Sequence, residues 1–212
     1  MNKSDTATFY IVRHGETDWN AKRIIQGQLD IPLNEKGELQ AKELAKELKN
    51  VKFDLAFSSD LLRAKYTAEL IMLEHNVTVQ TTEILRERMF GKLEGKSTDK
   101  LRELFADLST ELSHEERLRH KYDEEIESDE QMISRIITFI RETAVANPGQ
   151  NILLGTHGGI IKVLLVHLGY LSYKNMNEFR ITNTGYVILE SDGVEFKIQK
   201  VHGLRKIKEF EA

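Results

Sequence analysis

The 212-residue sequence contains no cysteine, only two prolines and one tryptophan, and few aromatic residues. Without cysteine the chain forms no disulfide bond, has no thiolate nucleophile and offers no cysteine ligand to a metal. No Pro- or Gly-rich stretch marks a linker between domains, and we find no internal repeat. The chain is therefore predicted to fold as one domain, residues 1–212, long enough to bury a sizeable core.

Long apolar runs and an excess of positive charge are missing as well. No apolar stretch approaches the roughly 20 residues that cross a bilayer, and the polar start Met-Asn-Lys-Ser-Asp-Thr has no signal-peptide core. The formal net charge of −4 gives no general attraction for nucleic acid or an anionic membrane. We therefore expect a cytoplasmic, globular protein that binds neither nucleic acid nor membrane. An anionic ligand would need a local pocket of cations.

Strand and helix patterns alternate along the chain. Apolar runs predict buried strands at residues 8–12, 54–57, 77–79 and 152–154. Helical spacing predicts helices that start after Asn34 and that span residues 62–73, 133–140 and 161–168. Residues 186–190 and 194–201 predict a closing hairpin. This alternation indicates an α/β fold: a single-domain α/β/α sandwich with a mostly parallel sheet and helices on both faces.

Residues 97–131 differ from the rest of the sequence. Helical spacing continues at Leu101, Leu104, Phe105 and Leu108, but residues 107–131 are dense in charge. One interpretation is a solvated helical excursion. The other is a small helical cap, inserted near 97–131, that lies over the carboxyl edge of the sheet and selects substrates. Ser128 follows Ile126-Glu127, and its role as the cap of the next helix is left open.

Two histidines follow predicted strands in the same way. Arg13-His14-Gly15-Glu16 comes directly after residues 9–12, and Thr156-His157-Gly158-Gly159 comes after residues 152–155. Sheets of α/β proteins bind ligands at the carboxyl ends of their strands. A single histidine in such a position is often an idle turn or core residue, whereas two indicate a shared crevice.

These residues suit phosphoryl transfer, which needs a nucleophile, cations on the phosphoryl oxygens and an acid for the leaving oxygen. A neutral imidazole nitrogen of His14 can attack phosphorus. The guanidinium groups of Arg13 and Arg63 match phosphate oxygens. His157 can donate a hydrogen bond to the transferred group. Taken alone, Arg63 would be interpreted as a surface arginine of a helix.

The acid is less clear from chemistry alone. Glu87 lies in Leu85-Arg86-Glu87-Arg88-Met89-Phe90-Gly91, where apolar neighbours can favour a protonated carboxyl group. Glu83 and Glu94 compete for this role. The other histidines show no metal-ligand spacing, and no Walker-type or dinucleotide-binding glycine loop occurs. The natural interpretation is a mechanism with no metal and no cofactor.

Four motifs occur in a fixed order: Arg-His-Gly-Glu-Thr, Ser-Ser-Asp-Leu-Leu-Arg, an acidic residue before Phe-Gly, and a late His-Gly. The set resembles the histidine phosphatase superfamily, in its phosphoglycerate-mutase-like branch, from about Phe9 to about Leu189. The resemblance implies that His14 carries the phosphoryl group. It implies that Glu87, four residues before Gly91, is the acid. It also implies that the substrate is bound by Asn20, Gln26, Gly27 and Gly158.

Members of this family divide mainly into hydrolases and mutases. Gly159 stands where the mutases usually have asparagine, and the chain lacks their adjacent arginine pair, since Arg117 and Arg119 are separated and flanked by acidic residues. We therefore expect a metal-independent phosphatase that hydrolyses small phosphomonoesters through a phosphohistidine. The alternatives are a 2,3-bisphosphoglycerate-dependent phosphoglycerate mutase and a non-catalytic phospho-ligand-binding module. The expected partner is a small phosphorylated metabolite, and a homodimer is allowed.

Overall fold

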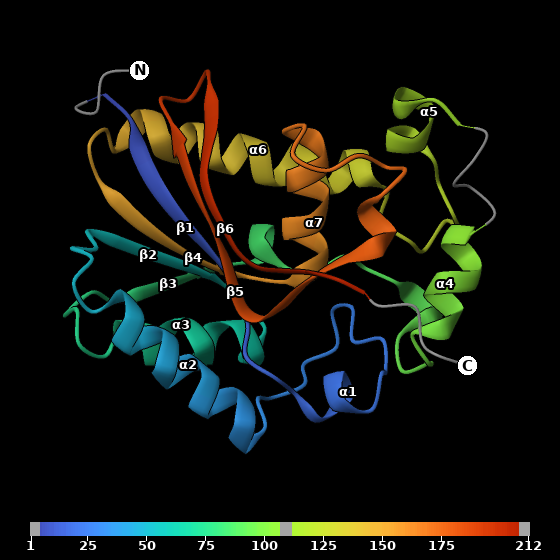
Figure 1. Cartoon of the computed structure of the whole chain (residues 1–212), viewed down its shortest axis with the longest axis horizontal. Coiled ribbons are helices and arrows are strands. Elements are labelled where there is room, and N and C mark those ends of the chain that lie inside the picture. The colour runs from blue at the N-terminus through green and yellow to red at the C-terminus, as the bar shows by residue number, and fades with distance from the viewer. Residues whose placement is uncertain (1–4, 107–111, 208–212) are drawn as a thin grey trace.

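The computed structural model of the chain describes residues 5–106 and 112–207 (Figure 1). Its strands are β1 (Ala7–Arg13), β2 (Leu55–Ser59), β3 (Val79–Thr82), β4 (Asn151–Thr156), β5 (Phe179–Ser191) and β6 (Phe196–Lys206). Its α-helices are α1 (Asp18–Ala21), α2 (Glu35–Leu48), α3 (Leu62–Met72), α4 (Asp99–Ala106), α5 (His114–Arg119), α6 (Asp129–Ala146) and α7 (Gly158–His167). Short 3-10 turns are η1 (Glu83–Leu85), η2 (Gly91–Leu93) and η3 (Met176–Glu178).

The strands form one mixed sheet in the order β3-β2-β4-β1-β5-β6. The four strands β3, β2, β4 and β1 run parallel, while β5 runs antiparallel to β1 and β6 antiparallel to β5. The predicted α/β fold with a mostly parallel sheet is confirmed. None of the helices in the two described ranges is both long and apolar enough to cross a membrane.

Helices cover both faces of the sheet, as Figure 1 shows, with α6 and α7 on one face and α2 and α3 on the other. The alternating side chains of β1 divide between two cores. Phe9 and Ile11 join the cluster that α6 and α7 complete, and Val12 joins the cluster that α2 and α3 complete. Because β1 and β4 lie in the middle of the sheet and are buried on both faces, their sequences are almost continuously apolar.

The region predicted as a cap contains α4 and α5, which lie together at one end of the molecule (Figure 1). Leu108 and the rest of residues 107–111 lie outside the described residues. A third apolar cluster is built on Ile25, Phe90 and Ile126, with Phe105 and Tyr122 packed against it. Ser128 is the N-cap of α6 and forms a capping box with Gln131.

Several strands differ in extent from the predictions, and β6, for example, runs to Lys206 and not only to residue 201. The β2 and β3 strands end later, at Ser59 and Thr82, because polar residues continue their pairing. The β5 strand begins at Phe179 rather than at residue 186. Its pairing with β6 is interrupted by a bulge, in which residues 182–185 lie between the pairs Ile181–Leu204 and Tyr186–His202. A bulge breaks the period-2 pattern from which a strand is predicted.

Candidate active site

The two strand-end histidines meet because β1 and β4 are neighbours in register. Arg13 pairs with Thr156, so the next residue of each strand, His14 and His157, emerges at the same point of the sheet edge. The backbone N–H of His14 donates to the Thr156 carbonyl at 3.0 Å. The two imidazole rings have centroids 5.2 Å apart and planes inclined by 60°. The structure thus joins two motifs that lie more than 140 residues apart.

A hydrogen bond made by the His14 ring fixes its tautomer. Nδ1 lies 2.7 Å from the Gly15 carbonyl oxygen. Because a carbonyl can only accept, Nδ1 must carry the proton, and in the neutral ring Nε2 keeps a free lone pair. Burial lowers the pKa of His14 well below 6.5, and the positive charges of Arg63 and Arg13 lower it further, against the opposing bond to Gly15. At neutral pH, the His14 ring is therefore unprotonated at Nε2, which is the state that a nucleophilic imidazole needs.

Gly15 allows the nucleophile loop to approach two helices closely. A Cβ atom on Gly15 would lie 2.4 Å from the backbone oxygen of Gly37 in α2. The Gly15 N–H donates to the Thr67 hydroxyl at 3.0 Å, and this hydroxyl donates to the Arg63 carbonyl at 2.6 Å. Thr67 therefore ties the nucleophile loop to the helix that carries Arg63, and nothing in the sequence motifs singled it out.

Arg63 is held by backbone carbonyl groups and not by a carboxylate. Its Nη2 donates to the Gly27 oxygen and its Nη1 to the Leu29 oxygen, both at 2.7 Å. Arg13 is held similarly, with Nη1 donating to the Ile181 oxygen at 2.5 Å. Burial lowers the pKa of each guanidinium to about 10, while the charge of Glu87 opposes this. Both arginines are thus cations at neutral pH.

Several buried side-chain nitrogens at this site have no hydrogen-bond partner among the residues that the structure describes. Nε of Arg13, Nε of Arg63 and both ring nitrogens of His157 are buried, and none makes a hydrogen bond among the described residues. A buried polar group without a partner costs on the order of 1–3 kcal/mol, and a charged group costs more. Charged donors of one sign indicate an anion as their ligand, and a phosphoryl group fits because its oxygens accept several such bonds.

Glu87 lies at the N-terminus of α7, beside this set of donors. Its Oε2 accepts from the Gly159 N–H and its Oε1 from the Arg88 N–H, both at 2.9 Å. A Cβ atom on residue 159 would lie 2.3 Å from Oε1. Any side chain there would displace the carboxylate, so Gly159 is what permits the observed position. Gln28 Nε2 also holds the Glu87 carbonyl at 3.1 Å.

The two competing carboxylates have other surroundings. Oε1 of Glu94 accepts from the backbone N–H groups of Gln28 and Phe90, both at 3.0 Å, so Glu94 ties the Arg63-binding loop to the segment of Glu87. The side chain of Glu83 is 76% exposed and pairs with Arg86 at 3.1 Å. Only Glu87 of the three contacts the start of α7, where His157 is the N-cap.

The predicted binding residues take different positions. Asn20 lies in α1, where Thr17 and Asn20 form a capping box. Gln26 is buried, and its Oε1 has no partner among the described residues. Gly27 acts through its carbonyl on Arg63, and a Cβ on Gly158 would lie 3.2 Å from Arg13 Nε. Sequence motifs missed Asn183, which donates to the His14 carbonyl at 3.1 Å.

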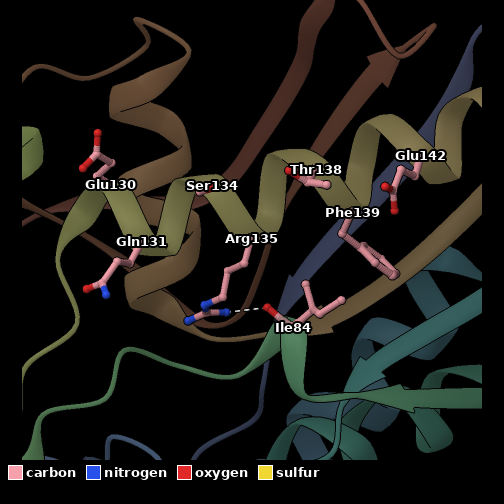
Figure 2. A pocket seen from close by; sticks show the side chains of 8 residues that line it. All are labelled: Ile84, Glu130, Gln131, Ser134, Arg135, Thr138, Phe139 and Glu142. Atoms are coloured by element: carbon pink, nitrogen blue, oxygen red, sulfur yellow. Dashed lines mark hydrogen bonds between the residues drawn. The ribbon is translucent and has the colours of Figure 1, made fainter.

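A groove of about 580 Å³ lies outside this site, between η1 and α6 (Figure 2). Its lining residues are Ile84, Glu130, Gln131, Ser134, Arg135, Thr138, Phe139 and Glu142. Arg135 crosses it to the Ile84 carbonyl and pairs with Glu127 at 2.7 Å. Because the two carboxylates on the groove would repel a phosphate and its arginine is already paired, this groove does not suit a phosphoryl group.

Comparisons with known proteins identify the family of this chain. The sequence profile of the histidine phosphatase superfamily (branch 1) matches residues 9–202. A probable phosphatase of Schizosaccharomyces pombe is 31% identical over 200 residues, covering 91% of this chain and 90% of that protein. A broad-specificity phosphatase of Saccharomyces cerevisiae is 32% identical over 202 residues, covering 91% and 84%. The crystal structure of a Bacillus anthracis phosphoglycerate mutase has a TM-score of 0.77 at 27% identity, covering 94% of both chains.

The lowered histidine pKa values predict how the protein responds to acid. The unfolded chain binds protons at His14 and His157 near pH 6.5, whereas the folded chain does so only at a lower pH. The free energy of unfolding should therefore fall as pH decreases below 6.5, by up to about 1.4 kcal/mol per pH unit for each histidine, until the folded-state pKa is reached.

Two measurements check this prediction. Urea unfolding between pH 7.5 and 5 should show a shallower pH dependence for His14→Gln than for the native chain. In NMR titrations of the native chain, the ring resonance that disappears in His14→Gln should not shift through pH 6.5. A midpoint near 6.5 for that resonance would contradict the assignment of a neutral nucleophile.

Proposed function

The chain belongs to branch 1 of the histidine phosphatase superfamily and is a phosphatase, and on this premise we propose that it hydrolyses small phosphomonoesters without a metal, through a phosphohistidine at His14. One observation carries the proposal. The ring of a neutral His14, with its free Nε2, lies within electrostatic reach of the guanidinium groups of Arg13 and Arg63, whose buried Nε atoms lack partners among the described residues. A nucleophile and an anion site are thereby combined.

In the first step, Arg13, Arg63 and His157 bind the phosphoryl oxygens. The lone pair of His14 Nε2 forms a bond to phosphorus as the ester P–O bond breaks. Glu87 gives its proton to the leaving oxygen, so an alcohol departs and a phosphohistidine remains. The Gly15 carbonyl, which accepts from Nδ1–H, stabilises the positive charge that develops on the ring.

In the second step, water attacks the phosphohistidine from the side that the alcohol has left. Glu87, now a carboxylate, takes a proton from this water as the P–N bond breaks. Inorganic phosphate is released, and the electron pair of the broken bond returns to Nε2. His14 is again neutral with its proton on Nδ1, and Glu87 is again protonated.

Two features favour hydrolysis over mutase activity. Arg117 and Arg119 do not form a joint anion site: Arg117 is 3% exposed and lies over the Tyr173 ring, whereas Arg119 is exposed and pairs with Glu130. Gly159 allows Glu87 to rest against the start of α7, close to the position that water must occupy. A non-catalytic binding module would not need the nucleophile or the acid, and both are present.

We further propose that residues 97–131 act as a cap that selects substrates. The cluster of Ile25, Phe90 and Ile126 packs this region against two segments of the site. Ile25 lies just before the residues whose carbonyl groups bind Arg63, and Phe90 lies just after Glu87. A groove of about 230 Å³ lies beside this cluster, lined by Gln28, Met89, Lys121, Glu124, Ile126, Glu127 and Gln131. The alcohol part of a substrate would face these residues. We also propose that the enzyme is cytoplasmic, because small phosphorylated metabolites would be its substrates; fractionation of cells with an antibody would test this location.

The nucleophile is tested by His14→Ala. Hydrolysis of para-nitrophenyl phosphate with a chelator present should proceed for the native chain and fall to the background rate for the variant. Rapid acid-free quenching with ³²P-labelled substrate should trap acid-labile phosphate on the native chain and none on the variant. Undiminished turnover by His14→Ala, or a strict requirement for magnesium, would overturn the proposed function.

The acid is tested by Glu87→Gln with two leaving groups. Alkyl phosphates need a proton on the leaving oxygen in the transition state, while aryl phosphates need it much less. The variant should therefore lose activity on alkyl substrates by on the order of 10² or more, and lose far less on para-nitrophenyl phosphate. Glu83→Gln, at the exposed competitor, should leave both rates unchanged. Equal losses on both substrates would assign the proton to another group.

The cap is tested at Lys121, which lines the smaller groove. Lys121→Glu should lower kcat/KM for an acidic phosphomonoester such as 3-phosphoglycerate by about two- to five-fold relative to para-nitrophenyl phosphate, because an exposed charge contributes about 0.2–1 kcal/mol. Lys100→Glu in α4, outside the groove, is the matched control. An unchanged ratio in Lys121→Glu would show that the region is structural and does not select substrates.

A further inference from the structure

Asn183 lies in the β5 bulge and contacts two parts of the candidate site at once. Its Nδ2 donates to the backbone oxygen of His14 and to Oδ1 of Asn20, both at 3.1 Å. The bulge makes this reach possible, because residues 182–185 face only Gly203 on β6 and are pushed out of the ladder. Thr184 adopts the left-handed conformation with φ 56°, and its N–H also donates to the His14 oxygen, at 3.3 Å.

These contacts fix which way the Asn20 carboxamide points. Its Oδ1 accepts from the Thr17 backbone N–H at 3.2 Å, and a backbone N–H can only donate. The atom of Asn183 that faces the His14 carbonyl must likewise be its amino group, because that oxygen can only accept. Backbone groups at both ends therefore determine the orientation of both carboxamides, and Asn183 cannot be reversed without losing a hydrogen bond.

The consequence concerns the other end of Asn20. With Oδ1 occupied by two donors, its Nδ2 points away from them, and this amino group makes no hydrogen bond within the part of the chain that the structure describes. It is left as a pure donor on a residue that Asn183 links to the His14 backbone. A reversed carboxamide would instead present an oxygen, which would repel a phosphoryl oxygen.

We propose that Asn183 is a positioning residue for phosphoryl transfer: it holds Asn20 as a donor toward the phosphoryl group and fixes the backbone of the nucleophile. Asn183 acts through Asn20 and His14 and does not itself touch the substrate. This inference rests on the proposed function, because it assumes that the phosphoryl group is bound at His14. It assigns a role to the β5 bulge, which interrupts an otherwise regular hairpin.

A double-mutant cycle with Asn20 tests the coupling. Alone, Asn20→Ala should lower kcat/KM for para-nitrophenyl phosphate by on the order of 10², as the loss of one preorganised donor does. Asn183→Ala should lower it by roughly 10-fold or more, as the loss of a group that orients such a donor does. In the Asn20→Ala background, Asn183→Ala should cost less than about three-fold, because only its bond to the His14 carbonyl is then left to lose. Inhibition by orthovanadate should weaken in the same non-additive pattern.

Two further variants keep the test decisive. Asn183→Asp has the same shape but presents an acceptor to the His14 carbonyl and to Asn20 Oδ1, so it should lose at least as much activity as Asn183→Ala. Asn147→Ala removes a comparable bond to a backbone carbonyl, that of Thr143 at 2.8 Å, far from the site, and should leave kcat/KM unchanged.

The possible failures are distinguishable. If His14→Ala remained active, the proposed function itself would fail, whatever the cycle shows. If His14→Ala were inactive but the losses at Asn20 and Asn183 simply multiplied, only the positioning role would be wrong. Full activity in Asn183→Asp would have the same meaning.

Discussion

The site depends on burying positive charge without a carboxylate partner for it. Arg13 and Arg63 are anchored by carbonyl oxygens of Ile181, Gly27 and Leu29, which orient a guanidinium but do not neutralise it. A carboxylate in bidentate contact would have satisfied each arginine and left little for a ligand. The positive charges of the two guanidinium groups therefore remain unneutralised in a region of low dielectric, where charges interact more strongly than in water.

The same charges determine the state of the histidines. A cation would be disfavoured between two guanidinium groups, so burial and repulsion together keep His14 and His157 neutral. Neutrality is what a nucleophilic imidazole requires. In the proposed mechanism, the negative charge of the phosphoryl group offsets the guanidinium charge, so that the positive charge on the phosphorylated ring becomes tolerable. The binding of the anion and the activation of the nucleophile are thus parts of one electrostatic balance.

Much of this arrangement could be predicted from the sequence, because it depends on local patterns. Apolar runs located β1 and β4, and parallel pairing then required His14 and His157 to meet at the same edge. The choice among Glu83, Glu87 and Glu94 could not be made from chemistry, since it depends on which backbone N–H groups surround each carboxylate. Glu94 accepts two such bonds in a loop contact that joins residues 66 positions apart, and no local pattern encodes that contact.

The start of β5 escaped prediction for a related reason. The residues of its bulge, Thr182-Asn183-Thr184-Gly185, read as a polar interruption and not as part of a strand. Their role is visible only when β5 lies beside β1, which brings Asn183 to a carbonyl 169 positions earlier in the chain. Regular pairing would have pointed this side chain to one face of the sheet and away from the strand end. The irregularity that weakens the sequence signal is the same feature that brings the Asn183 carboxamide to His14. A broken strand pattern near the end of a neighbouring strand is therefore a reason to look for function there.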